Sequence, residues 1–173
     1  MTHFFRRVSP LACLIIGLMM SPPTATAKPE RSLPFALCLK GGLTFTPADN
    51  GKVQIKADMA GVAKHFGMSK AAAVWLAPQT VIADLESGVI QQANIGAGTL
   101  NAITANGSSV MGSFTGRLVR LRSGLIGFES SFIINGGTGH LAGTSGDGIM
   151  IGTADPESLE FRLKVIGSLT SAR

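Results

Sequence analysis

Charged side chains that interrupt apolar stretches are the first candidates for chemistry in this sequence. Arg117 and Glu129 lie within runs of alternating apolar and polar residues, and Asp84 and Asp147 lie in two further apolar stretches. A charged pair inside an apolar enclosure is costly to desolvate and is expected only where it has a function. On the outer face of a sheet, the same residues form ordinary cross-strand pairs. These four residues are therefore the candidate catalytic groups, provided that they face inward.

Other reactive residue types are sparse and scattered. His65 and His140 lie far apart, and neither belongs to a set of three or four metal ligands at suitable spacing. We therefore expect no metal ion and no cofactor. His140 follows a glycine turn and is predicted to be solvated, whereas Cys38 is predicted to be a buried, inert thiol. No Gly-x-Ser-x-Gly motif supports a serine hydrolase.

Strict alternation in the second half of the chain predicts the strands that would position these groups. The segments 109–121 and 125–134 have period two, as expected for strands with one buried face. Arg117 and Glu129 share the faces opposite the largest apolar side chains, so an outward orientation is favoured for this pair. The predicted lining of an interior pocket is Phe114, Leu118, Phe128 and Phe132.

Further strands are predicted on both sides of this pair. Segments 148–153 and 159–169 complete the second half, and 37–46 and 52–58 flank an Asn-Gly turn in the first half. Strand-like runs also occupy 80–86 and 88–104. The segment 59–75 shows near-helical spacing and contains three consecutive alanines, so it is predicted to form one short helix. The whole is an all-β chain, and seven or eight strands with one short helix are typical of a barrel or a sandwich.

Composition restricts the function classes. With 45% hydrophobic and 14% charged residues, the chain is not disordered. The net charge of +5 is spread along the chain, so no nucleic-acid-binding surface is expected. The first 27 residues combine Arg6 and Arg7, an apolar run that is too short to span a bilayer, and an Ala25-Thr26-Ala27 cleavage pattern. We expect residues 1–27 to be a signal peptide and 28–173 a single exported domain, periplasmic or extracellular, with no integral membrane span.

A glycine-rich segment, FIINGGTGHLAGTSGDG at 132–148, is the most distinctive stretch. It lacks the Lys-Ser/Thr of a phosphate-binding loop and is followed by a strand pattern, which argues against nucleotide binding. Instead, a strand is predicted to end at Asn135, to turn through 136–139 and to return as a second glycine-rich strand.

This segment resembles the strand–turn–strand signature of the dirigent and allene oxide cyclase superfamily. The matching features are the apolar strand 132–134, Gly136-Gly137-Thr138-Gly139, the bulky Leu141 and the small-residue run 142–148. The resemblance covers about residues 108–153. It implies an eight-stranded antiparallel barrel with an apolar pocket, in a family whose members are often trimers, so a homotrimer is one expected assembly. The triplet Thr144-Ser145-Gly146 departs from the plant pattern, so dirigent or cyclase activity does not carry over.

Three functional hypotheses follow from these patterns. The first is a secreted barrel that binds a small apolar molecule, or assembles with copies of itself, without chemistry. The second is a cyclase or isomerase that steers an apolar intermediate by confinement, which needs few charged groups. The third, an outer-membrane barrel, would need aromatic girdles, but the chain has no tyrosine and a single tryptophan. The orientation of the four candidate catalytic residues discriminates between the first two hypotheses.

The leader generates a testable prediction about processing. Because signal peptidase recognises the small-x-small pattern, cleavage after Ala27 should leave Lys28 as the first residue of the exported protein. N-terminal sequencing of the exported protein checks this prediction, and an intact Met1 would refute it.

Overall fold

The computed structural model describes residues 31–64 and 67–171 of the 173-residue chain. The predicted leader, with Cys13, and His65 lie outside the described residues. Within them, eight antiparallel strands in sequence order close into one barrel, and β1 pairs with both β2 and β8. The strands are β1 Arg31–Ala48, β2 Lys52–Ala63, β3 Gly67–Pro78, β4 Gln92–Thr104, β5 Ser109–Arg120, β6 Ile126–Thr138, β7 Thr144–Ala154 and β8 Glu160–Ser171.

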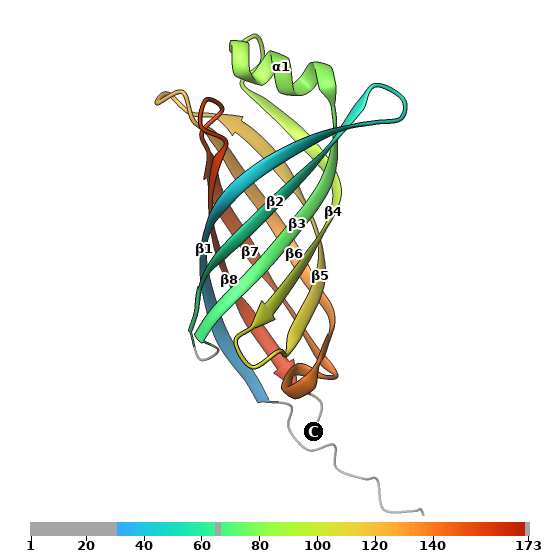
Figure 1. The fold of residues 1–173 in the computed structure, drawn as a ribbon, viewed down its shortest axis with the longest axis vertical. Coiled ribbons are helices and arrows are strands. Elements are labelled where there is room, and N and C mark those ends of the chain that lie inside the picture. The colour runs from blue at the N-terminus through green and yellow to red at the C-terminus, as the bar shows by residue number, and fades with distance from the viewer. Residues whose placement is uncertain (1–30, 65–66, 172–173) are drawn as a thin grey trace, which may run out of the picture.

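This architecture confirms the predicted all-β, antiparallel, eight-stranded closed barrel with one short helix. The barrel is tall and its strands are strongly tilted; helix α1, Gln79–Ser87, lies across one end (Figure 1). We call this the helix end; it also carries the β1–β2, β5–β6 and β7–β8 connections. The opposite end carries the short 3₁₀ helix η1, Gly139–Leu141, between β6 and β7.

Alternation along the strands fills the barrel with apolar side chains. Phe114, Leu118, Phe128 and Phe132, the predicted interior residues, are between 2% and 6% exposed. The small residues Ala57 and Ala73 from β2 and β3 are also buried and belong to the same core. Since an eight-stranded barrel is just wide enough for its own side chains, a closed core of this kind is its natural filling.

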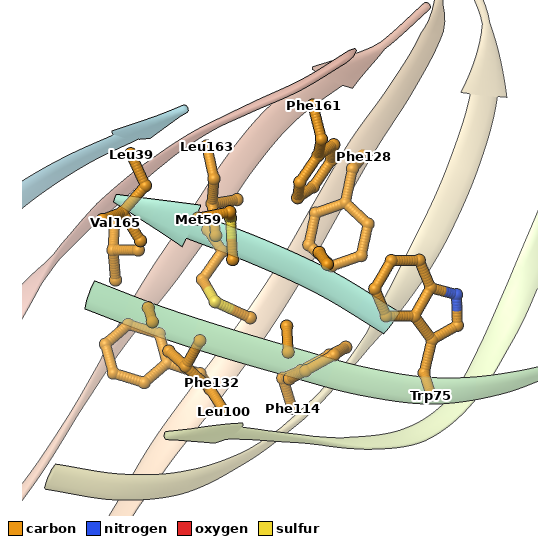
Figure 2. Close-up of a cluster of buried hydrophobic side chains, with 14 of the residues drawn as sticks. Leu39, Met59, Trp75, Leu100, Phe114, Phe128, Phe132, Phe161, Leu163 and Val165 are labelled. Carbon is orange, nitrogen blue, oxygen red and sulfur yellow. The ribbon is translucent and has the colours of Figure 1, made fainter. Parts of the chain in front are cut away.

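Four aromatic side chains form what we call the aromatic layer: Trp75, Phe114, Phe128 and Phe161. Phe128 lies at the centre, with ring centroids 5.7 Å from Trp75, 5.7 Å from Phe114 and 5.8 Å from Phe161 (Figure 2). These are edge-to-face or tilted contacts, the arrangements that aromatic rings prefer. Gly98 makes room for the layer, because a Cβ there would lie 2.3 Å from Cζ of Phe114.

The helix and one strand are exchanged relative to the prediction from sequence. The predicted helix at 59–75 is wrong, since this segment forms parts of β2 and β3, and the predicted strand at 80–86 is α1. Alanine favours helix intrinsically, but here Ala71, Ala73 and Ala77 alternate inward with Trp75, and barrel packing overrides propensity. Pro78 ends β3 and adopts the extended conformation that precedes α1.

The glycine-rich segment also turns later than predicted. Strand β6 continues through Gly136 and Gly137 to Thr138, with an irregularity in its pairing to β5 near Met111, and η1 makes the turn. Gly139 has a φ of 60°, in the left-handed region that favours glycine. Asn50 and Gly51 are likewise left-handed and close the predicted β1–β2 hairpin.

Gly137 and Gly136 provide a matched test of this turn. A Cβ on Gly137 would lie 2.3 Å from the carbonyl oxygen of Leu141 and 2.7 Å from that of Ser109, whereas a Cβ on Gly136 would meet nothing within 4 Å. Because the clash is with backbone, Gly137→Ala should lower the free energy of unfolding by about 1–3 kcal/mol. Gly136→Ala should change it by less than about 1 kcal/mol. Denaturant titrations check both values; equal effects would contradict this account of the turn.

Candidate functional site

Two small cavities remain inside the barrel, one on each side of the aromatic layer. The cavity at the helix end has a volume of about 50 Å³, and that at the opposite end about 30 Å³. Cavities that enclose drug-sized ligands usually measure ~300–1,000 Å³. The described interior is therefore close to fully packed, and a ligand that enters the interior must enlarge one of these cavities.

The helix-end cavity is apolar on nearly every side. Trp75, Phe128 and Phe161 of the aromatic layer line it, and Ile82 and Leu85 of α1 contribute from the barrel end. The carboxylates of Glu86 and Asp155 are its charged lining groups. The remaining lining residues are Leu43, Phe45, Ile55, Leu118, Ile126, Ala154, Pro156 and Leu159.

Helix α1 is a lightly anchored cover for this cavity. Its first turn has no side-chain cap and no acidic residue. The N–H of Gln79 donates a hydrogen bond to the carbonyl oxygen of Gly51 in the β1–β2 turn, at 3.0 Å. Leu85 is its one fully buried side chain. At its C-terminal end, Arg120 of β5 donates hydrogen bonds from Nη1 to the carbonyl oxygens of Leu85, at 2.7 Å, and Glu86. A cation at a helix C-terminus complements the helix dipole, so Arg120 holds the C-terminal end of α1 to β5. We call this contact the latch of α1.

The β7–β8 connection supplies the opposite rim. The Oδ1 atom of Asp155 accepts hydrogen bonds from the backbone N–H groups of Glu157, at 2.9 Å, and Ser158, at 3.4 Å. These bonds, with the Glu157 N–H first, lower the pKa of Asp155 below its usual value, so this carboxylate is ionised at neutral pH. Leu159 has a φ of 58°, an unfavourable conformation for a branched residue, and lines the cavity mouth.

The four predicted pocket residues all point inward but are divided along the barrel axis. Leu118 and Phe128 line the helix-end cavity, Phe132 lines the cavity at the opposite end, and Phe114 lies in the aromatic layer between them. The sequence therefore identified the apolar interior but placed one continuous pocket where the structure has two separated cavities.

None of the four candidate catalytic residues lines the helix-end cavity. Arg117 and Glu129 are directly opposite each other on β5 and β6, half exposed, and form an ion pair on the outer wall with 2.6 Å between Nη2 and Oε2. This is the outward orientation that the sequence favoured. Asp147 is exposed on the outer face of β7, and Asp84 lies on α1. The structure brings only Arg117 and Glu129 together.

Other predicted reactive residues are also on the surface. Cys38 is exposed on the outer face of β1, so the prediction of a buried thiol is wrong; the inward positions on either side are taken by Leu37 and Leu39. His140 is exposed, as predicted. Within residues 31–64 and 67–171, no three His, Cys, Asp or Glu side chains are grouped to hold a metal ion. The same residues contain no helix that is long and apolar enough to cross a membrane.

Sequence reasoning missed Trp75, Arg120, Asp155 and Leu159. Trp75 is the only tryptophan in the chain, and this alone could have marked it as a candidate residue. It lies, however, in the segment that the sequence predicts to be a helix and that forms β3. Glu86 and Arg120 are brought together only by the closure of the barrel. Comparisons with protein-family models, curated proteins and solved structures find no match for the chain. The function therefore has to be argued from the geometry of this site.

The latch of α1 generates a prediction about local opening. Arg120→Met keeps the aliphatic stem but removes the hydrogen bonds to the C-terminal carbonyls, so amide hydrogen exchange across 79–87 should accelerate roughly fivefold or more. Arg117→Met, which removes the exposed ion pair with Glu129, is the matched control and should leave exchange in α1 unchanged. Hydrogen exchange measured by mass spectrometry checks both variants, and equal protection of α1 in both would show that Arg120 is not its latch.

Proposed function

We propose that the protein is an exported barrel that binds a small apolar molecule at its helix end, without catalysing a reaction. The observation that carries this proposal is the apolar cavity between the aromatic layer and a lightly anchored α1. The glycine-rich resemblance to the dirigent and allene oxide cyclase superfamily and the predicted leader support it independently.

Binding requires an opened form of the helix end. The 50 Å³ cavity holds a few water molecules at ~10–15 Å³ each, so a larger ligand has to displace part of its cover. The parts of the cover that can move away from the cavity are α1, whose C-terminal boundary is the left-handed Gly88, and the strained Leu159. A ligand that binds only the opened form shifts the population toward it. The affinity is reduced by the cost of opening.

Charges on the outer wall support a barrel that works in water. Lys40 and Arg162 both pair with Glu160, at 2.9 and 2.7 Å, and Lys56 pairs with Asp58 at 2.8 Å. These groups project outward from the strands, while the interior is apolar. Barrels that span lipid have a polar interior, whereas the interior described here is apolar.

The homotrimer that the resemblance implies stays a prediction. The exposed side chains of the outer wall indicate where its subunits would meet. Exposed isoleucines gather on neighbouring strands β6, β7 and β8, where Ile149 and Ile166 lie directly opposite each other. The members of this group are Ile133, Ile149, Ile151 and Ile166. This is the surface of the described barrel on which contacts between copies are most expected.

Two alanine-to-phenylalanine substitutions test the binding site. Ala154 faces inward beside Phe161 and lines the helix-end cavity, so Ala154→Phe should fill it and weaken binding of the neutral probe N-phenyl-1-naphthylamine by about tenfold or more. Ala60 is exposed on the outer face of β2 and lines a groove on the outer wall, so Ala60→Phe is the control and should leave affinity unchanged. Fluorescence titration gives the dissociation constants, and thermal melting verifies that both variants fold.

Two results would contradict the proposal. One is an absence of probe binding to the wild-type protein. The other is weakened binding in Ala60→Phe with unchanged binding in Ala154→Phe, which would place the probe on the outer wall.

A further inference from the structure

The indole nitrogen of Trp75 is a buried donor with no acceptor in the part of the chain that the structure describes. Trp75 is only 3% exposed, and its Nε1 atom has no hydrogen-bond partner among the described residues. Buried polar side-chain atoms in folded proteins are almost always hydrogen-bonded, so each exception needs a reason. Tryptophan in particular has a single N–H donor and usually finds an acceptor for it when buried.

The position of this donor relates it to the helix-end cavity. Trp75 lines that cavity and lies just beyond Val74, the last residue at which β3 is paired with β4. In Figure 2 the nitrogen points away from the rings of Phe114 and Phe128, along β3 toward its carboxyl end. That end continues directly into α1 (Figure 1). The unpaired N–H is thus directed to the side of the aromatic layer on which the cavity lies.

We infer that the ligand of the helix-end cavity is an uncharged apolar molecule with one hydrogen-bond acceptor, a carbonyl or ether oxygen, which accepts from Nε1 of Trp75. The inference rests on the proposed function and adds the chemical class of the ligand. The apolar lining recognises the body of the molecule, and the single donor recognises its oxygen. Trp75 is then the residue that determines specificity.

Burial explains why the donor can discriminate between ligands. Nε1 of Trp75 is out of contact with solvent in the closed structure, so it becomes available to a ligand only when the helix end opens. A hydrocarbon bound there would leave the buried N–H without an acceptor, and an unpaired buried donor costs free energy. A ligand with a suitably placed oxygen supplies the acceptor. The site therefore favours an oxygenated molecule over a hydrocarbon of the same shape.

The rim of the cavity disfavours anionic ligands. Its charged lining residues are Glu86 and Asp155, both acidic, and the backbone N–H of Glu157 further lowers the pKa of Asp155. Arg120, which contacts the C-terminal end of α1, is engaged by the carbonyl oxygens of Leu85 and Glu86. A carboxylate ligand would meet like charges at the mouth and find one neutral donor inside. The expected class is therefore a ketone, aldehyde or ether, and not a fatty acid.

Acetophenone, ethylbenzene and benzoate test this inference, because they share a ring and differ in the oxygen and the charge. In ligand-observed NMR titrations, the wild-type protein should bind acetophenone about threefold to tenfold more tightly than ethylbenzene, and benzoate most weakly. Trp75→Phe keeps an aromatic ring but removes the N–H, so it should equalise acetophenone and ethylbenzene. Ala60→Phe, on the outer wall, removes no donor and should preserve the preference for acetophenone.

A second readout reports the hydrogen bond itself. The carbonyl stretching frequency of acetophenone should be lower when bound to the wild-type protein than when dissolved in a hydrocarbon. An unshifted frequency would overturn the inference even if Trp75→Phe failed to fold. Equal binding of acetophenone and ethylbenzene to the wild-type protein would overturn it too, while leaving the proposed function intact. Failure of both molecules and of N-phenyl-1-naphthylamine to bind would instead remove the proposed function and, with it, the inference.

Discussion

The packing of four aromatic rings across the middle of the barrel is the constraint on which the other features depend. A barrel of eight strands has an interior that its own side chains can fill, and the aromatic layer of Trp75, Phe114, Phe128 and Phe161 does so. Rings of this size fit because small residues such as Ala57, Ala73 and Gly98 occupy neighbouring positions. The layer divides the interior into two small cavities and excludes a continuous channel.

Because of this division, the two ends of the barrel differ in how well they suit the binding of a ligand. The helix end combines a lightly anchored cover, a strained residue at the mouth and a buried donor without a partner. At the opposite end, the lining of the small cavity is built from strand residues alone. Strained residues and unsatisfied buried groups cost stability, and they concentrate where a ligand can compensate for them. Their coincidence at one end is the structural basis of the proposed binding site.

The sequence predicted the barrel well where large side chains alternate with polar ones, as in β5, β6 and β8. It failed at β3 and α1, because Ala71, Ala73 and Ala77 carry little hydrophobic contrast and favour helix when considered alone. The inward faces of Phe114, Leu118, Phe128 and Phe132 were predictable from period two. Their division between two cavities, and the meeting of Arg120 with the end of α1, depend on strand tilt and closure, which local patterns do not encode.

Intermolecular nuclear Overhauser effects between a bound ligand and assigned methyl groups test the central claim most directly. With acetophenone bound to the wild-type protein, the account predicts contacts to Leu118 and Ile126, which line the helix-end cavity. Contacts confined to Ala102 and Val110, at the opposite end, would contradict it. Contacts confined to Ile149 and Ile151, in a groove on the outer wall, would contradict it equally.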